Sequence, residues 1–194
     1  QHYLVDPPTI DRTLGEFLAL HGRRQLACSE TQKFGHVTYF FNGNRSGMFD
    51  ESREQYIEIP SDNCDFSERP WMKAAEITDA SLRAIDERRP DFVRLNYANG
   101  DMVGHTGVLK SAIEAMESLD VALSRFVNGV LARDGVCLVT ADHGNCEQMG
   151  ERDKKTGLPL VGSSPEGFVA NTSHSRFPVP VALATKRPSA YQMV

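Results

Sequence analysis

The chain has 194 residues, and its 21 basic and 26 acidic side chains give a net charge of −5. This acidic balance argues against a nucleic-acid-binding surface, and the short basic clusters, such as Arg23–Arg24, are typical of solvated helix ends. No apolar run approaches the roughly 18 residues of a membrane-crossing helix, so we expect no membrane contact.

The N-terminal part predicts a hinge, a helix and several strands. Two adjacent prolines stiffen residues 1–8, so we expect a linker there and a single domain over residues 9–194. Thr9 or Asp11 could cap a helix that ends near His21. Strands are predicted at residues 25–28, 36–41 and 56–59, the second being rich in β-branched and aromatic side chains.

The rest of the chain alternates helices with strands. The clearest helix is predicted over residues 108–133, because apolar side chains from Ile113 to Val130 recur at three-four spacing. This alternation predicts an α/β fold with a largely parallel sheet and flanking helices. The other elements are a helix over 71–89, strands at 92–97, 136–140 and 179–184, and a Gly/Pro-rich excursion at 151–170.

The cysteines favour a reducing compartment. The four cysteines form no CxxC pair. Cys28 and Cys137 fall inside predicted buried strands, where a free cysteine behaves as a small apolar residue. We therefore expect a cytoplasmic protein.

The strand at 136–140 ends abruptly in Asp142 and His143. A short β-branched run followed by a carboxylate and an imidazole predicts a metal site at the C-terminal edge of a parallel sheet. We therefore expect this strand to be central and parallel. Taken alone, the pair also fits a turn-capping aspartate beside a surface histidine.

Three further residues offer matching ligand types. Asp101 and His105 are four positions apart and would share one face of a helix, although a capping aspartate with an incidental histidine is an alternative. His174 precedes the last strand and, taken alone, is more typical of a loop. Together, two aspartates and three histidines suit Zn, Mn or Co and supply most of a two-metal centre. The remaining histidines lack such companions: His2, His21 and His36.

Several motifs in the same order resemble the cofactor-independent, metal-dependent phosphoglycerate mutases of the alkaline-phosphatase superfamily. The resemblance runs along nearly the whole chain. It is carried by residues 29–33, 35–43, 96–107 and 140–145, and by His174 followed by Pro178–Pro180.

The resemblance implies roles for the candidate residues. Asp101, His105 and His174 would hold one divalent ion, and Asp142 and His143 would help to hold a second. Mn or Co is expected, with Zn or Mg as alternatives. Lys33, expected in a turn between two strands, would contact the phosphorylated substrate. Without the resemblance, Lys33 is a plain surface lysine.

The family interconverts 3-phosphoglycerate and 2-phosphoglycerate through a phosphoserine intermediate, a step of glycolysis and gluconeogenesis. Its phosphatase-like domain is built from two chain segments, and a transferase domain is inserted between them. The early aspartate, the nucleophilic serine and the inserted domain have no counterpart here, so no catalytic nucleophile is assigned. Residues 1–8 align with the hinge from the inserted domain.

We therefore expect an incomplete, alkaline-phosphatase-like sheet. It would be the C-terminal part of an isomerase whose partners are phosphoglycerate and the remaining segments of the same enzyme. Two alternatives remain open. One is another phosphomutase or phosphohydrolase of the superfamily, such as a phosphopentomutase. The other is a non-catalytic metal-binding domain.

Overall fold

The computed structural model describes residues 10–191, so the predicted hinge at residues 1–8 lies outside the described residues. Within them, the chain divides into two compact units, residues 10–61 with 79–97 and residues 62–78 with 98–191. Helices alternate with strands, and the larger sheet is parallel, so the predicted α/β class is confirmed. None of the helices in the described part is long and apolar enough to span a bilayer.

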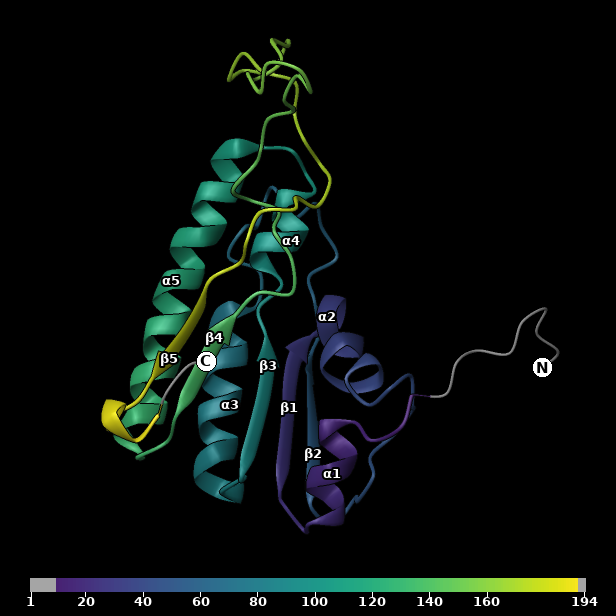
Figure 1. Cartoon of the computed structure of the whole chain (residues 1–194), viewed down its shortest axis with the longest axis vertical. Coiled ribbons are helices and arrows are strands. Elements are labelled where there is room, and N and C mark those ends of the chain that lie inside the picture. Colours follow the sequence, from purple (N-terminus) through teal and green to yellow (C-terminus); the bar gives the residue numbers. More distant parts are fainter. Residues whose placement is uncertain (1–9, 192–194) are drawn as a thin grey trace, which may run out of the picture. The chain divides into compact units, whose positions relative to one another are not determined.

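A three-stranded parallel sheet forms the centre of the first unit (Figure 1). Strand β1 (Gln25–Glu30) pairs on one side with β2 (Glu54–Ile59) and on the other with β3 (Phe92–Asn96). All six residues of β1 are buried, as expected for a strand with neighbours on both edges. Helix α1 (Leu14–Leu20) precedes β1 and begins at Thr13, whose Oγ1 accepts a hydrogen bond from the Glu16 amide at 3.3 Å.

The strand predicted at residues 36–41 is wrong. β1 leads into helix α2 (Thr31–Gly35), which continues as the π-helix η1 (His36–Phe40). The Asn42 amide donates to the Thr38 carbonyl at 3.0 Å, so the backbone bonds here run along a helix and not between strands. Burial of Val37 and Thr38 on this helix outweighs the β-propensity of the run. Lys33 consequently lies in a helix and not in a turn between strands.

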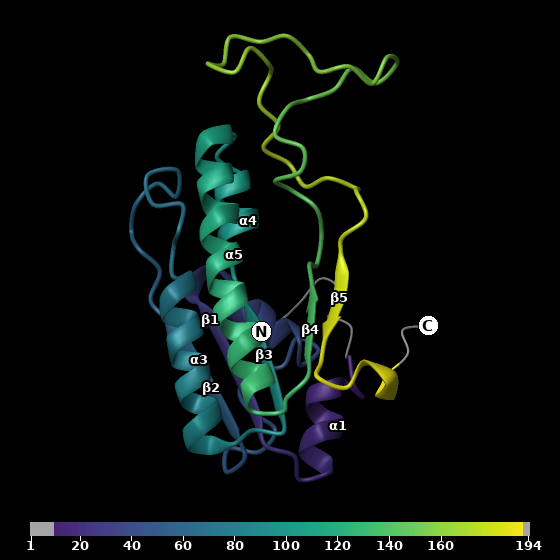
Figure 2. The same cartoon turned by 90° about the vertical axis from the view of Figure 1, so that its left-hand side faces the viewer.

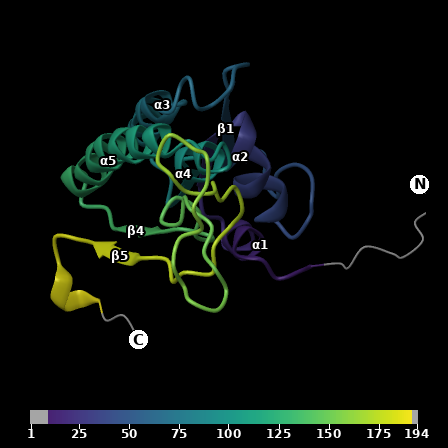
Figure 3. The ribbon, with the colours of Figure 1, turned by 90° about the horizontal axis from the view of Figure 1, so that it is seen from above.

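The second unit contains two helices that pack together, α4 (Asn99–Gly104) and α5 (Leu109–Ala132); Figure 3 shows them side by side. The buried Ala115 of α5 and Val103 of α4 belong to one apolar cluster, which also includes Met72. Small alanines on α5 allow the short α4 to approach closely, which fixes the position of the residues that α4 carries. Helix α3 (Ala74–Arg88) begins in this unit and ends in the first.

Strand β4 (Cys137–Thr140) is not the central parallel strand that the sequence predicts. Among the described residues it pairs only with β5 (Val181–Ala184), and the pairing is antiparallel (Figure 2). Exposure alternates along β4, and Leu138 is 62 % exposed. The apolar run looked like a buried strand, but one face of this two-stranded ribbon has no cover in the described chain. Cys137 is accordingly half-buried and not buried.

The excursion at residues 151–170 is confirmed as irregular. It contains only isolated bridges, such as Val161 with Phe168, and Figure 2 shows it beyond the ends of α4 and α5. A final 3-10 turn, η2 (Pro188–Ala190), follows β5.

Candidate metal centre

Helix α4 places Asp101 and His105 on one face. The His105 amide donates to the Asp101 carbonyl at 3.1 Å, so the two side chains lie one helical turn apart. His105 Nε2 lies 3.0 Å from Asp101 Oδ1. His174, 73 positions further along the chain, brings its Nε2 to 3.0 Å from the same oxygen and to 3.0 Å from His105 Nε2. Three predicted ligands thus meet at one point.

The orientation of the His105 ring suits a metal ligand. Its Nδ1 lies 2.7 Å from the Thr172 carbonyl, which can only accept a hydrogen bond, so the Nδ1 position carries the proton. In a neutral imidazole this leaves the lone pair on Nε2, the atom that faces Asp101 and His174. Histidines that bind metals commonly donate their second ring N–H to a carbonyl in this way.

His143 and Asp142 lie at the border of this cluster. They follow β4 directly, so the prediction that they stand at the C-terminal end of a strand holds, although the strand is antiparallel. His143 Nε2 is 3.5 Å from Asp142 Oδ2 and 3.9 Å from Asp101 Oδ1. The His143 ring stacks on the His174 ring with centroids 3.7 Å apart.

These distances allow two divisions of the donors. Ligand atoms of Asp101, His143 and His174 lie within 4.8 Å of one another, which would place His143 in the first site. His105 approaches Asp101 more closely than His143 does, at 3.0 Å against 3.9 Å. The prediction that His105 joins Asp101 and His174 in one site, and that His143 joins Asp142 in a second, stays a prediction.

The donor set fits a divalent ion. Bonds of ~2.1 Å place neighbouring ligand atoms ~3.0 Å apart around an octahedral ion and ~3.4 Å apart around a tetrahedral one. The three donor atoms of Asp101, His105 and His174 are each 3.0 Å from the other two, which matches one face of an octahedron. Two imidazoles and one carboxylate on one face suit a divalent transition-metal ion.

Cys146 lies next to the cluster without being a ligand of the expected type. Its Sγ donates to the Gly100 carbonyl at 2.8 Å. Burial, with smaller contributions from the Glu147 and Asp101 charges, raises the pKa of Cys146 to about 11. The side chain is therefore a neutral thiol at pH 7, whereas metals bind the thiolate.

Lys33 belongs to the first unit, where α2 follows the C-terminal end of β1. Its side chain is buried, so a plain surface lysine is contradicted. The C-terminal edge of a parallel sheet is where open α/β folds bind ligands. The predicted contact with a phosphorylated substrate stays a prediction.

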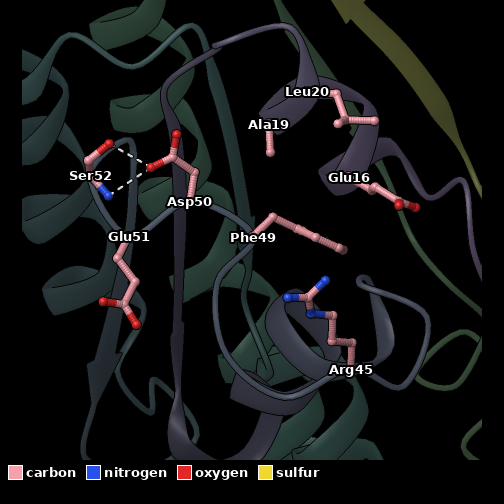
Figure 4. A pocket seen from close by; sticks show the side chains of 8 residues that line it. All are labelled: Glu16, Ala19, Leu20, Arg45, Phe49, Asp50, Glu51 and Ser52. Carbon is pink, nitrogen blue, oxygen red and sulfur yellow. Dashed lines mark hydrogen bonds between the residues drawn. The ribbon is translucent and has the colours of Figure 1, made fainter.

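A cavity of about 620 Å³ lies in the first unit, and Figure 4 shows its lining. The Arg45 guanidinium lies 4.3 Å over the Phe49 ring, and Asp50 is occupied by Ser52, which donates to it at 2.6 Å. None of the predicted site residues lines this cavity. This cavity therefore supports none of the roles predicted for those residues.

Comparison with known proteins agrees with this geometry. Residues 3–192 match the profile described as Metalloenzyme superfamily. The chain belongs to that superfamily. A carboxylate and several histidines that converge from distant positions are the kind of donor set that such a family requires.

Relatives of this chain include several phosphoglycerate mutases. The 2,3-bisphosphoglycerate-independent phosphoglycerate mutase of Trypanosoma brucei brucei is 51% identical over 180 residues, which cover 93% of this chain and 32% of the relative. The enzyme of the same name from Nicotiana tabacum is 50% identical over 183 residues, 94% of this chain and 32% of the relative. The resemblance seen in the motifs is thereby confirmed.

A solved structure supports the fold. Leishmania mexicana phosphoglycerate mutase, crystallised at low cobalt concentration, superposes with a TM-score of 0.88 and 48% sequence identity. The match covers 94% of this chain and 33% of that one. The chain thus spans about a third of the length of the relatives it matches.

Asn145, for which the sequence alone indicates no role, lies against Asp101. Its only signal was its position two residues after His143, at the end of a motif that carries the resemblance.

Proposed function

We propose that this chain carries most of the metal ligands of a 2,3-bisphosphoglycerate-independent phosphoglycerate mutase, an isomerase of glycolysis and gluconeogenesis. The observation that carries the proposal is the meeting of Asp101, His105 and His174 within 3.0 Å, in a chain about half identical to such mutases. All four cysteines are free, which supports a cytoplasmic location.

The proposed site holds two divalent ions, Mn or Co. Asp101, His105 and His174 hold the first, and Asp142 and His143 contribute to the second. Bound there, the ions would lower the pKa of a serine hydroxyl and neutralise charge on the transferred phosphoryl group. The cobalt of the Leishmania mexicana crystals supports a divalent ion of this kind.

Lys33 is proposed to contact the phosphate of the substrate. A buried ammonium group loses little entropy on binding, and in a site shielded from water its charge stabilises a phosphate strongly.

Asp142 and His143 are too few for a complete second site. We propose that the remaining ligands, the nucleophilic serine and the substrate-gripping domain belong to other segments of the same enzyme, reached through the hinge at residues 1–8.

The test uses the complete protein and an enolase-coupled assay with 3-phosphoglycerate. Stripping with a chelator should abolish turnover, and Mn²⁺ or Co²⁺ should restore it. Asp101→Asn removes the central ligand charge and should lower turnover by roughly a thousandfold or more. Asp134→Asn is the matched control, because the Asp134 side chain is 81% exposed and pairs with Lys186 on the surface of the described chain. Its turnover should stay within about twofold of wild type.

Three outcomes would contradict the proposal. Full turnover in chelator-treated protein would exclude a metal-dependent site. Metal-dependent turnover of a phosphopentose, with none of 3-phosphoglycerate, would transfer the site to a different mutase. Metal binding without turnover of either substrate would leave a non-catalytic domain.

A further inference from the structure

The side-chain NH₂ group of Asn145 donates two hydrogen bonds to Asp101. Its side chain is 5% exposed, and its Nδ2 lies 2.9 Å from Asp101 Oδ1 and 3.1 Å from the Asp101 carbonyl oxygen. The same NH₂ group therefore donates to the carboxylate and to the backbone of one residue. These two hydrogen bonds together fix the direction in which the Asp101 carboxylate points.

The Asn145 amide fits in the structure only because residue 104 is a glycine, and one of its atoms is left without a hydrogen bond. A Cβ atom at Gly104 would lie 2.3 Å from Asn145 Oδ1, so no larger residue fits there without moving Asn145. Asn145 Oδ1 is buried and has no hydrogen-bond partner among the described residues. A buried oxygen left without a donor destabilises the folded state, so stability alone does not account for an asparagine here.

The backbone of Asn145 is also held. Glu147 accepts a hydrogen bond from the Asn145 amide at 2.8 Å, and its other carboxylate oxygen accepts one from Ser175 Oγ. The Ser175 amide in turn donates to the Gly144 carbonyl at 2.9 Å. The loop that carries Asn145 is thus tied to the segment that carries His174.

We propose that Asn145 is a positioning residue that holds the Asp101 carboxylate in the orientation required for metal binding, in space left by Gly104. The inference rests on the proposed metal site. Hydrogen bonds to a ligating carboxylate fix its geometry before the ion arrives, and losing such a bond commonly costs roughly 10–100-fold in metal affinity. An asparagine that places its NH₂ donor against Asp101 must also bury its Oδ1, and the unpaired Oδ1 lowers the stability of the folded state.

The test is Mn²⁺ titration of the complete, chelator-stripped protein by calorimetry, together with the thermal unfolding of the metal-free form. Asn145→Leu keeps a branched side chain of similar size but removes the donor and the unpaired oxygen. We expect its Mn²⁺ dissociation constant to rise at least about tenfold. The metal-free melting temperature should not fall, a combination that a merely structural role would not produce. Asn128→Leu is the control, because Asn128 lies on α5 and, within the described part of the chain, its side chain bonds Ser124.

Each outcome decides the matter. A dissociation constant within about threefold of wild type for Asn145→Leu overturns the inference, even though the wild-type protein binds Mn²⁺. If Asn145→Leu does not fold, Gly104→Ala replaces it, since the added methyl group displaces the amide. A tenfold loss supports the inference and unchanged affinity overturns it. Failure of wild type to bind Mn²⁺ or Co²⁺ would instead refute the proposed function itself, and the inference with it.

Discussion

Strand β1 (QLACSE) carries three polar residues and β4 (CLVT) only one, yet β1 is the more deeply buried of the two. β1 is paired on both edges, and all six of its residues are buried. β4 is paired on one edge, and its residues alternate between half-buried and exposed. The apolar character of a short run therefore does not determine its burial, because burial depends on which other segments cover it. The strand with the less protected surroundings is the one that leads to the candidate ligands Asp142 and His143.

The two units also differ in the hydrogen bonds that join their elements. In the first unit, the buried Arg94 side chain donates to the Val37 carbonyl on η1 and to the Gln25 side chain on β1. In the second unit, the candidate ligands lie on a short helix and on loops, which are joined by side-chain hydrogen bonds such as those of Asn145. We expect changes in the first unit to affect stability and changes around Asp101 to affect metal binding.

The largest expected effect is on turnover. Under the proposed function, Asp142→Ala in the complete protein should lower mutase turnover by roughly a thousandfold or more, because the proposed second ion loses a ligand. The unfolding free energy should change by less than about 1 kcal/mol, because the Asp142 side chain is 50% exposed. The enolase-coupled assay and urea unfolding measure the two quantities. Normal turnover would remove Asp142 from the site.

Arg94→Met should act in the opposite way. Arg94 donates to the Val37 carbonyl at 2.6 Å and to Gln25 Oε1 at 2.9 Å, and its guanidinium lies 4.4 Å from the Phe41 ring. Removing these donors leaves buried acceptors unpaired, so we expect a loss of about 3 kcal/mol in unfolding free energy. Mn²⁺ affinity should be unchanged.

Arg53→Met is the control for Arg94→Met, because the Arg53 side chain is 49% exposed and donates to only one backbone carbonyl, that of Gly22. A loss below about 1 kcal/mol is expected there. If Arg94→Met also weakened Mn²⁺ binding more than about threefold, the two regions would not be separable in this way.

A smaller effect concerns the thiol beside the candidate ligands. Because burial raises the pKa of Cys146 to about 11, its thiolate fraction at pH 8 should be roughly a hundredfold below that of an ordinary thiol. The rate of iodoacetamide labelling at Cys146, followed by peptide mass spectrometry, should rise with pH until about pH 11. A rate that levels off near pH 9 would show that the thiol is not buried as described.

The sequence predicted those features that depend on local periodicity. The long helix expected over residues 108–133 occurs as Leu109–Ala132, because its apolar spacing extends over several turns. Asp101 and His105 were paired correctly on one helix face for the same reason. The π-helix at His36–Phe40 was not predicted, because its β-branched and aromatic residues favour a strand. The sequence does not show that Val37 and Thr38 are buried when this segment is helical.

Other features depend on distant segments and have no local signal. β4 pairs with β5, some forty residues later, and a four-residue apolar run does not reveal the direction of its partner. His174 was linked to Asp101 by resemblance and not by spacing. Asn145 was missed because its role depends on a close approach to Gly104, which the sequence shows only as two unrelated residues.

The smallest effect is expected for Leu138→Thr, and its comparison with Leu26→Thr tests the contrast between the two strands directly. Leu26 on β1 is 1% exposed, whereas Leu138 on β4 is 62% exposed. Leu26→Thr removes buried methyl groups and buries a hydroxyl, so its unfolding free energy in urea should fall by about 3 kcal/mol. Leu138→Thr places a good strand former on an uncovered face and should change it by less than about 0.5 kcal/mol. Both variants are to be measured in the 194-residue chain and in the complete protein. A loss of about 2 kcal/mol or more for Leu138→Thr in the complete protein alone would mean that another segment covers this face of β4, and that the strand leading to Asp142 and His143 becomes buried only there.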